Sequence, residues 1–112
     1  MNNYVVYMHI KGSDGEPFYI GKGRPTRPTE TYDRSKLWCN ITRKYGRVAK
    51  VLYTGLSDNS AKAIEIFWIA VYGRRDNNTG ILVNHTNGGD GSSGFIMSNQ
   101  HKAAILKANL VS

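Results

Sequence analysis

The sequence is poor in cysteine, in clustered histidine and in long apolar runs. Its single cysteine, Cys39, cannot form an internal disulfide, and three scattered histidines give no spacing typical of a zinc site. No apolar run is long enough to cross a bilayer, and the N-terminus lacks the charged-then-apolar pattern of a secretory signal. We therefore expect a soluble cytoplasmic protein with no membrane partner, and neither a disulfide scaffold nor a zinc domain.

Acidic residues are scarce as well. Eight Asp and Glu residues stand against 15 Lys and Arg residues, which gives a net charge of +7. Nine of the 15 positive charges lie between residues 22 and 50, where Glu30 and Asp33 are the only acids. This clustering predicts a basic face suited to a polyanion, whereas a merely soluble basic protein would spread its charge more evenly.

The N-terminal pattern predicts an antiparallel hairpin within a single domain. Residues 3–10 are rich in β-branched and aromatic types, residues 11–17 form a turn cluster, and a second strand begins at residue 18. The two-residue period of a strand gives each face its own set: Tyr4, Val6 and Met8 on one, and Val5, Tyr7 and His9 on the other. Tyr7 and Tyr19 are then candidate cross-strand neighbours, with the register left open.

A helix and a third strand are predicted after the hairpin. Asp33 and Ser35 are both acceptable N-caps, and Gly46 is a typical helix stop. The apolar repeat of this helix consists of Leu37, Ile41 and Tyr45. Residues 47–54 then read as a strand.

A second helix is predicted over residues 61–72 and ends at Gly73. Its apolar stripe comprises Ile64, Phe67, Trp68, Val71 and Tyr72. A short strand at 81–83, a glycine-rich loop to residue 94 and a helix over 98–110 complete the chain. The predicted fold class is α/β, more narrowly α+β: a small three-stranded antiparallel sheet flanked by helices.

One strand ending is unusual. The stretch FYIGKG, residues 18–23, places two glycines around Lys22 at the end of an apolar run. Glycine weakens a strand interior and packs no side chain, so its presence indicates that something approaches the backbone closely. We expect a ligand to make that approach.

Glu65 is the anomaly of the second helix. It lies among apolar residues on a helix that is apolar almost all round, where a charge is costly without a partner. Taken alone, it is best explained as a boundary residue that reaches water or an arginine. The surplus of cations and the lack of other acids within a strongly predicted element favour a second explanation, in which a metal ion is the partner.

Five motifs in order resemble the GIY-YIG nuclease domain, and particularly its phage and homing-endonuclease members. They are Tyr7 of VVY, Tyr19 of YIG, Arg27, the helical Glu65, and Asn84 of LVNHTNGG. The likeness spans about residues 4–90, and motifs in sequence are more specific than any one of them. It implies a nuclease domain over 1–92 and a C-terminal helical extension over 93–112, similar to the start of an appended DNA-binding module.

The resemblance implies a metal-dependent DNA endonuclease in which Tyr7 takes a proton from the attacking water. Tyrosine has a reference pKa of about 10, so this role needs a nearby cation, and Lys22 is the candidate. Tyr19 would position water or phosphate. With this assignment, the two glycines of FYIGKG would let DNA approach the backbone while Lys22 acts on tyrosine or phosphate.

The remaining motif residues complete the implied site. Arg27 would contact the scissile phosphate and stabilise the transition state. Glu65 would hold one Mg²⁺, or Mn²⁺, per active site, and Mg²⁺ needs few protein ligands because it keeps much of its water. Asn84 would fix local geometry by hydrogen bonding.

The chain departs from the family pattern in two places. Val5 replaces the first glycine of GIY, and Thr31 and Tyr32 stand where many members have a histidine. Tyr32 is the candidate substitute in catalysis. The histidines of this chain do not match that position, and surface or loop roles are expected for them: His9, His85 and His101.

Double-stranded DNA is the expected partner, in host-cell cytoplasm if the protein is phage-encoded, with a homo-oligomer or a companion specificity domain as further partners. The predicted DNA-binding residues are Lys22, Arg24, Arg34, Lys36, Arg43 and Lys44. Two other functions stay open: a module that binds nucleic acid without cutting it, and an RNA-binding or RNA-cleaving domain that stacks bases on aromatic residues. Each motif residue alone also has an ordinary structural explanation; the case for a nuclease depends on their joint presence.

Overall fold

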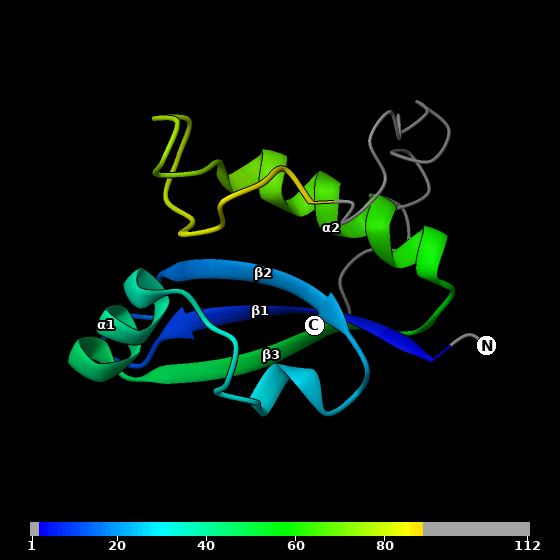
Figure 1. The fold of residues 1–112 in the computed structure, drawn as a ribbon, viewed down its shortest axis with the longest axis horizontal. Coiled ribbons are helices and arrows are strands. Elements are labelled where there is room, and N and C mark those ends of the chain that lie inside the picture. The colour runs from blue at the N-terminus through cyan, green and yellow to red at the C-terminus, as the bar shows by residue number, and fades with distance from the viewer. Residues whose placement is uncertain (1–2, 89–112) are drawn as a thin grey trace.

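The computed structural model describes residues 3–88, so the predicted helix over 98–110 and the extension over 93–112 lie outside the described residues. A three-stranded antiparallel sheet has the order β2-β1-β3. It is formed by β1 (Tyr4–Lys11), β2 (Pro17–Gly23) and β3 (Arg47–Leu56). Two α-helices accompany it (Figure 1), which confirms the predicted α+β fold. None of the helices within residues 3–88 has the length and apolar character needed to cross a membrane.

The hairpin pairs β1 with β2, and its register does not place Tyr7 directly opposite Tyr19. Tyr7 lies opposite Gly21, while Tyr19 lies opposite His9. The two tyrosines are therefore diagonal neighbours on one face, with ring centroids 6.2 Å apart.

The helix α1 (Lys36–Tyr45) starts at Ser35, whose side chain accepts a hydrogen bond from the Trp38 backbone N–H at 3.1 Å. It ends at Gly46, which adopts a φ of 78°. Of the predicted apolar repeat, Ile41 is in the core and Tyr45 packs against it, whereas the prediction for Leu37 was wrong. Leu37 is exposed and Trp38 is buried in its place, because the rotation of a helix about its axis is decided by what it packs against.

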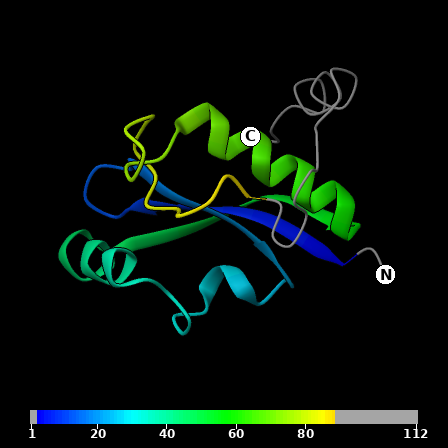
Figure 2. The ribbon, with the colours of Figure 1, turned by 45° about the horizontal axis from the view of Figure 1, so that its top comes forward.

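The helix α2 (Asp58–Tyr72) runs along the sheet (Figure 2). It begins three residues before the predicted start, because Ser57 caps it by accepting from the Ser60 backbone N–H. Val71, expected on the apolar stripe, is exposed. Residues of α2 share a hydrophobic core cluster with the sheet. The buried residues of this cluster are Val6, Ile20, Ala61, Ile64, Ile69 and Leu82.

Residues 81–83 do not form the predicted strand, although they follow the free edge of β2. A single parallel bridge joins Arg74 to Leu82. The Val83 backbone N–H then donates to the Phe18 carbonyl at 2.8 Å. Regular pairing stops there because the Asn84 side chain, and not its backbone, makes the next contact with β2.

His9 is fully buried, which corrects the expectation of a surface or loop role. Its Nε2 donates to the Pro28 carbonyl at 2.7 Å, and its Nδ1 accepts from the Trp38 indole N–H at 3.0 Å. Because the carbonyl can only accept and the indole can only donate, the ring is neutral with its proton on Nε2. Burial lowers the pKa of His9 from 6.5 to about 4.

This buried ring predicts a pH-dependent stability. Between pH 6.5 and about 4, His9 binds a proton in the unfolded chain but not in the folded chain. The free energy of unfolding therefore falls as the pH falls across that window. At about 1.4 kcal/mol per pKa unit, the loss is roughly 3 kcal/mol. Urea unfolding at several pH values measures it. His9→Gln should lose this part of the pH dependence and the exposed-site control His85→Gln should keep it; equal pH dependence in the two variants would contradict the assignment.

Candidate active site

A cavity of about 360 Å³ opens where β1, β2, α2 and the loop before α1 meet. Six of the seven predicted catalytic residues line it: Tyr7, Tyr19, Lys22, Arg27, Glu65 and Asn84. The seventh, Tyr32, does not line it, and its side chain is exposed. Arg34, which was predicted only as a DNA-binding residue, lines the cavity as well. Residues that lie up to 77 positions apart in the chain, from Tyr7 to Asn84, therefore meet at one place.

The two glycines of FYIGKG make room for two of these side chains. A Cβ atom on Gly21 would lie 2.5 Å from the Tyr7 hydroxyl oxygen, and one on Gly23 would lie 2.9 Å from the Arg27 Cβ. Neither distance is sterically tolerable, so each glycine is explained by the neighbouring side chain. The sequence had predicted the approach of a ligand to the backbone, and the structure provides an intramolecular reason instead.

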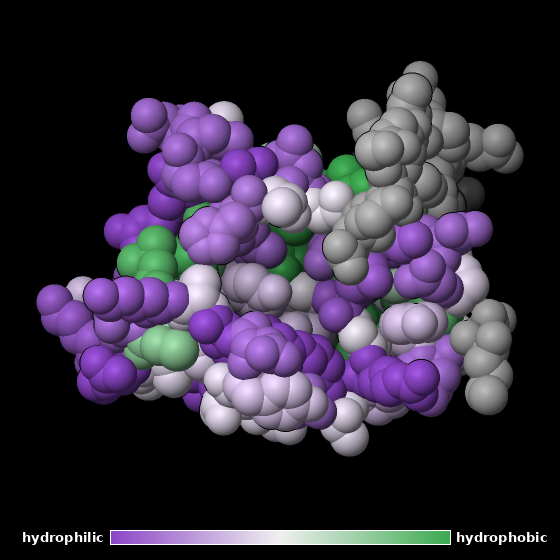
Figure 3. Space-filling model, viewed as in Figure 1, coloured by the Kyte–Doolittle hydropathy of each residue, from purple (hydrophilic) through white to green (hydrophobic). Residues whose placement is uncertain are grey.

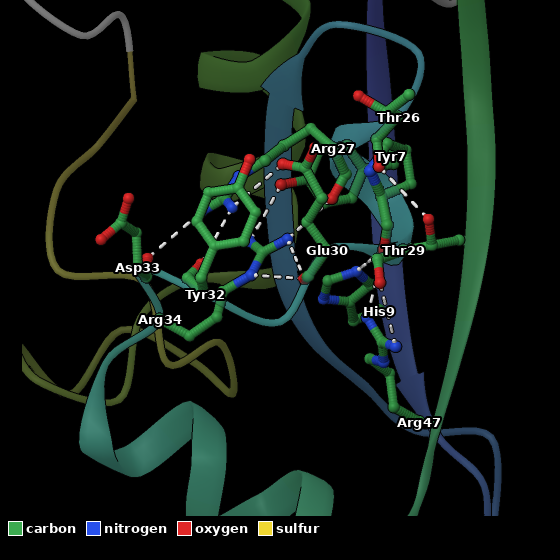
Figure 4. Close-up of polar contacts among 11 residues, drawn as sticks. Tyr7, His9, Thr26, Arg27, Thr29, Glu30, Tyr32, Asp33, Arg34 and Arg47 are labelled. Carbon is green, nitrogen blue, oxygen red and sulfur yellow. Dashed lines mark hydrogen bonds and ion pairs between the residues drawn. The ribbon is translucent and has the colours of Figure 1, made fainter.

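Tyr7 is buried, and its hydroxyl oxygen accepts a hydrogen bond from Arg34 Nη1 at 3.0 Å (Figure 4). The rest of the Arg34 guanidinium binds backbone. Nη2 donates to the carbonyls of Arg27 at 2.9 Å and Glu30 at 3.0 Å, and Nε donates to the Glu30 carbonyl at 3.1 Å. The guanidinium carbon also lies 5.1 to 5.7 Å from the ring centroids of Tyr7, Tyr19 and Trp38.

Arg27 is the first residue of the short 3-10 helix η1 (Arg27–Thr29), and its guanidinium binds carbonyls of the residues just before Arg34. Its Nη1 donates to the Tyr32 carbonyl at 2.9 Å, and its Nη2 donates to the Asp33 carbonyl at 3.2 Å. Each of the two arginines thus binds carbonyls near the other along the chain (Figure 4). We call these carbonyl contacts of Arg27 and Arg34 the arginine clasp.

Tyr32 belongs to the outer side of the clasp. Its ring centroid lies 5.3 Å from the Arg27 guanidinium carbon. A hydrogen bond to the Glu30 carboxylate raises the pKa of Tyr32. With its side chain at the surface, Tyr32 is placed beside Arg27 and not at the Tyr7 hydroxyl.

Lys22 is not the cation at Tyr7, which corrects the prediction. Its Nζ lies 3.5 Å from an Asp58 carboxylate oxygen and 5.6 Å from the Tyr4 ring centroid. The register explains this: Lys22 pairs with Val6, whose side chain packs towards α2, while Tyr7 points to the other face. Arg34 is the cation that contacts the Tyr7 hydroxyl. Its position in the sequence does not distinguish it from the other cations of the loop.

Glu65 is buried, with 8% of its surface exposed. The explanation of Glu65 as a boundary residue that reaches water is therefore wrong. The chain after α2 returns past it, and a Cβ on Gly88 would lie 3.1 Å from the Glu65 Oε1. The pKa of Tyr19 is raised to about 12. Burial is the largest cause, followed by the nearby Tyr7 and, more weakly, by the Glu65 carboxylate. Tyr19 therefore keeps its proton at neutral pH and can donate a hydrogen bond.

No family model, curated protein or solved structure matches the chain. The likeness to GIY-YIG nucleases therefore rests on the motifs in the sequence. Among residues 3–88 no three or more His, Cys, Asp or Glu side chains gather as a ready-made metal site. Of the predicted DNA-binding residues, four are exposed outside the cavity: Arg24, Lys36, Arg43 and Lys44.

Asn84 holds the cavity wall to the sheet edge. Its Oδ1 accepts from the Ile20 backbone N–H at 3.1 Å, and its Nδ2 donates to the Ile20 carbonyl at 2.7 Å. This is a long-range pair and not the local turn contact that is usual for asparagine. The side chain thus replaces a strand residue at the open edge of β2.

Asn84→Asp should destabilise the fold strongly, because it removes the donor and places a buried carboxylate against the Ile20 carbonyl. We expect a loss of roughly 2–4 kcal/mol in the free energy of unfolding. The same change at exposed Asn59, in the first turn of α2, should stay within about 0.5 kcal/mol. Equal urea midpoints for the two variants would show that the Asn84 contacts contribute nothing.

Proposed function

We propose that the chain is a metal-dependent endonuclease that hydrolyses phosphodiester bonds in double-stranded DNA, as the GIY-YIG resemblance implies. One observation carries the proposal: Tyr7, Arg27 and Glu65 come from β1, η1 and α2 and line the same cavity. A phenol, a guanidinium and a carboxylate are the groups that this hydrolysis needs for proton transfer, phosphate binding and metal binding.

Tyr7 is the proposed base. In the phenolate form its oxygen takes a proton from water, the water oxygen forms the new P–O bond, and the bond to the leaving alkoxide breaks. The leaving oxygen takes a proton from solvent, and Tyr7 then returns its own proton to solvent. Tyr19, protonated beside it, donates to the attacking water or to a phosphate oxygen. In this proposal the Tyr7 oxygen acts as the base and the Tyr19 hydroxyl as a hydrogen-bond donor.

Arg27 is the proposed phosphate ligand. Its guanidinium is held by the Tyr32 and Asp33 carbonyls, so its orientation is set before the substrate arrives. Planar guanidinium donors match phosphate oxygens, and their attraction grows as negative charge develops in the transition state.

The donor set fits one Mg²⁺ or Mn²⁺. Glu65 offers a buried carboxylate at the cavity wall, and a hard cation of this kind needs one or two carboxylates plus water and substrate oxygens. When bound, such an ion supplies charge stabilisation for the phosphoryl oxygens.

The exposed cations would hold the DNA outside the cavity. Arg24, Lys36, Arg43 and Lys44 carry charge on the surface, outside a cavity that already contains Arg27 and Arg34. The face seen in Figure 3 is mostly hydrophilic, which suits a polyelectrolyte partner.

Supercoiled plasmid with Mg²⁺ tests the proposal. Wild type should nick or linearise it, whereas Glu65→Gln and Arg27→Ala should each slow cleavage on the order of 10²- to 10³-fold, because each removes a group that acts in the transition state. The matched controls remove the same charges at exposed sites: Glu16→Gln and Arg75→Ala should cleave like the wild type.

Equal cleavage by all five proteins would reject the assigned site. A mobility shift that weakens with salt, without nicks under any divalent metal, would favour the non-cleaving module instead. Preference for RNA over DNA in competition would favour the RNA alternative.

A further inference from the structure

We propose that Arg34 is a positioning residue for Tyr7: it holds the phenol oxygen as an acceptor and stabilises that oxygen once its proton is gone. The inference rests on the proposed nuclease function and extends it to a residue outside the five motifs. Its basis is the 3.0 Å contact from Arg34 Nη1 to the Tyr7 hydroxyl oxygen.

The direction of this hydrogen bond follows from chemistry. A guanidinium has five N–H donors and no acceptor, so the Tyr7 oxygen must accept. The hydroxyl proton of Tyr7 therefore points away from Arg34. When that proton leaves, the same contact becomes a charge-assisted hydrogen bond to a phenolate, which is shorter and stronger than the neutral one.

Arg34 is also held in place independently of Tyr7. Three hydrogen bonds to the carbonyls of Arg27 and Glu30 fix its plane, and three aromatic rings surround it. The side chain is half-buried, so its charge acts on Tyr7 through less water than a surface lysine would. Lys22 on β2, the other cation considered for Tyr7, forms an ion pair with Asp58.

A purely structural role is the competing explanation, because Arg34 also closes the loop. Arg47 provides the matched control. It too is half-buried, donates to the Pro28 and Thr29 carbonyls of this loop, and lies 5.4 Å from the Trp38 ring centroid. Its hydrogen bonds go to the loop and not to Tyr7. Arg47→Met therefore removes a comparable loop contact and no hydrogen bond to the phenol, so that only the through-space effect of the Arg47 charge on Tyr7 is lost.

The first measurement is the pH–rate profile of plasmid cleavage for Arg34→Met, Arg34→Lys and Arg47→Met. Arg34→Met should cleave at least tenfold more slowly near neutral pH and recover as the pH rises, so that its profile moves to the alkaline side. Arg34→Lys should restore part of the rate because it keeps the charge. Arg47→Met should shift the profile clearly less than Arg34→Met does, even if its rate falls.

The second measurement needs no cleavage. Ultraviolet absorbance follows tyrosinate formation, and the difference between each protein and its Tyr7→Phe counterpart isolates the Tyr7 contribution. Removing Arg34 should move this contribution to higher pH, and clearly further than removing Arg47, which makes no hydrogen bond to Tyr7.

The outcomes separate the inference from the function. An unmoved Tyr7 contribution in folded Arg34→Met, or a profile that scales without shifting, would overturn the role of Arg34 even if the wild type cuts DNA. A wild type that never cuts, together with a shifted Tyr7 contribution, would overturn the nuclease proposal and support the coupling of Arg34 to Tyr7.

Discussion

The site depends on the guanidinium of Arg34. The stretch 27–34, within the connection between β2 and α1, has little apolar surface to bury, and it is ordered by arginine donors that bind its own carbonyls. The inner end of this arginine clasp reaches the Tyr7 oxygen, so one side chain both shapes the loop and sets the surroundings of a buried phenol. Backbone carbonyls in a loop must find donors, and here the donors are the cations that also give the cavity its charge.

Close packing connects this site to the fold. Gly21 and Gly23 leave space for the Tyr7 ring and the Arg27 side chain, and Asn84 ties the last wall of the cavity to the backbone of Ile20. Beneath them, His9 remains neutral between Pro28 and Trp38 and joins the loop to α1. The cavity is thus built from contacts that cross the whole described chain, which is why its polar groups can be held at defined positions.

Features set by local chemistry could be predicted from the sequence. The two faces of β1, the cap at Ser35 and the stops at Gly46 and Gly73 each follow from residues within a few positions. The anomaly of Glu65 was visible because a carboxylate interrupts an apolar helix. Features set by long-range packing could not be predicted. Trp38 replaces Leu37 in the core because of what α1 packs against, and Arg34 meets Tyr7 because the loop folds back.

Paramagnetic broadening by Mn²⁺ tests the central claim, that distant stretches share one ion-binding, DNA-contacting cavity. Labelled protein would be mixed with a non-cleavable duplex and titrated with Mn²⁺ while amide signals are followed by NMR. The account predicts that signals near Tyr7, Tyr19, Glu65 and Asn84 broaden together at the lowest Mn²⁺ ratios, and that Glu65→Gln abolishes the effect. Broadening confined to another surface, or unchanged by Glu65→Gln, would contradict it.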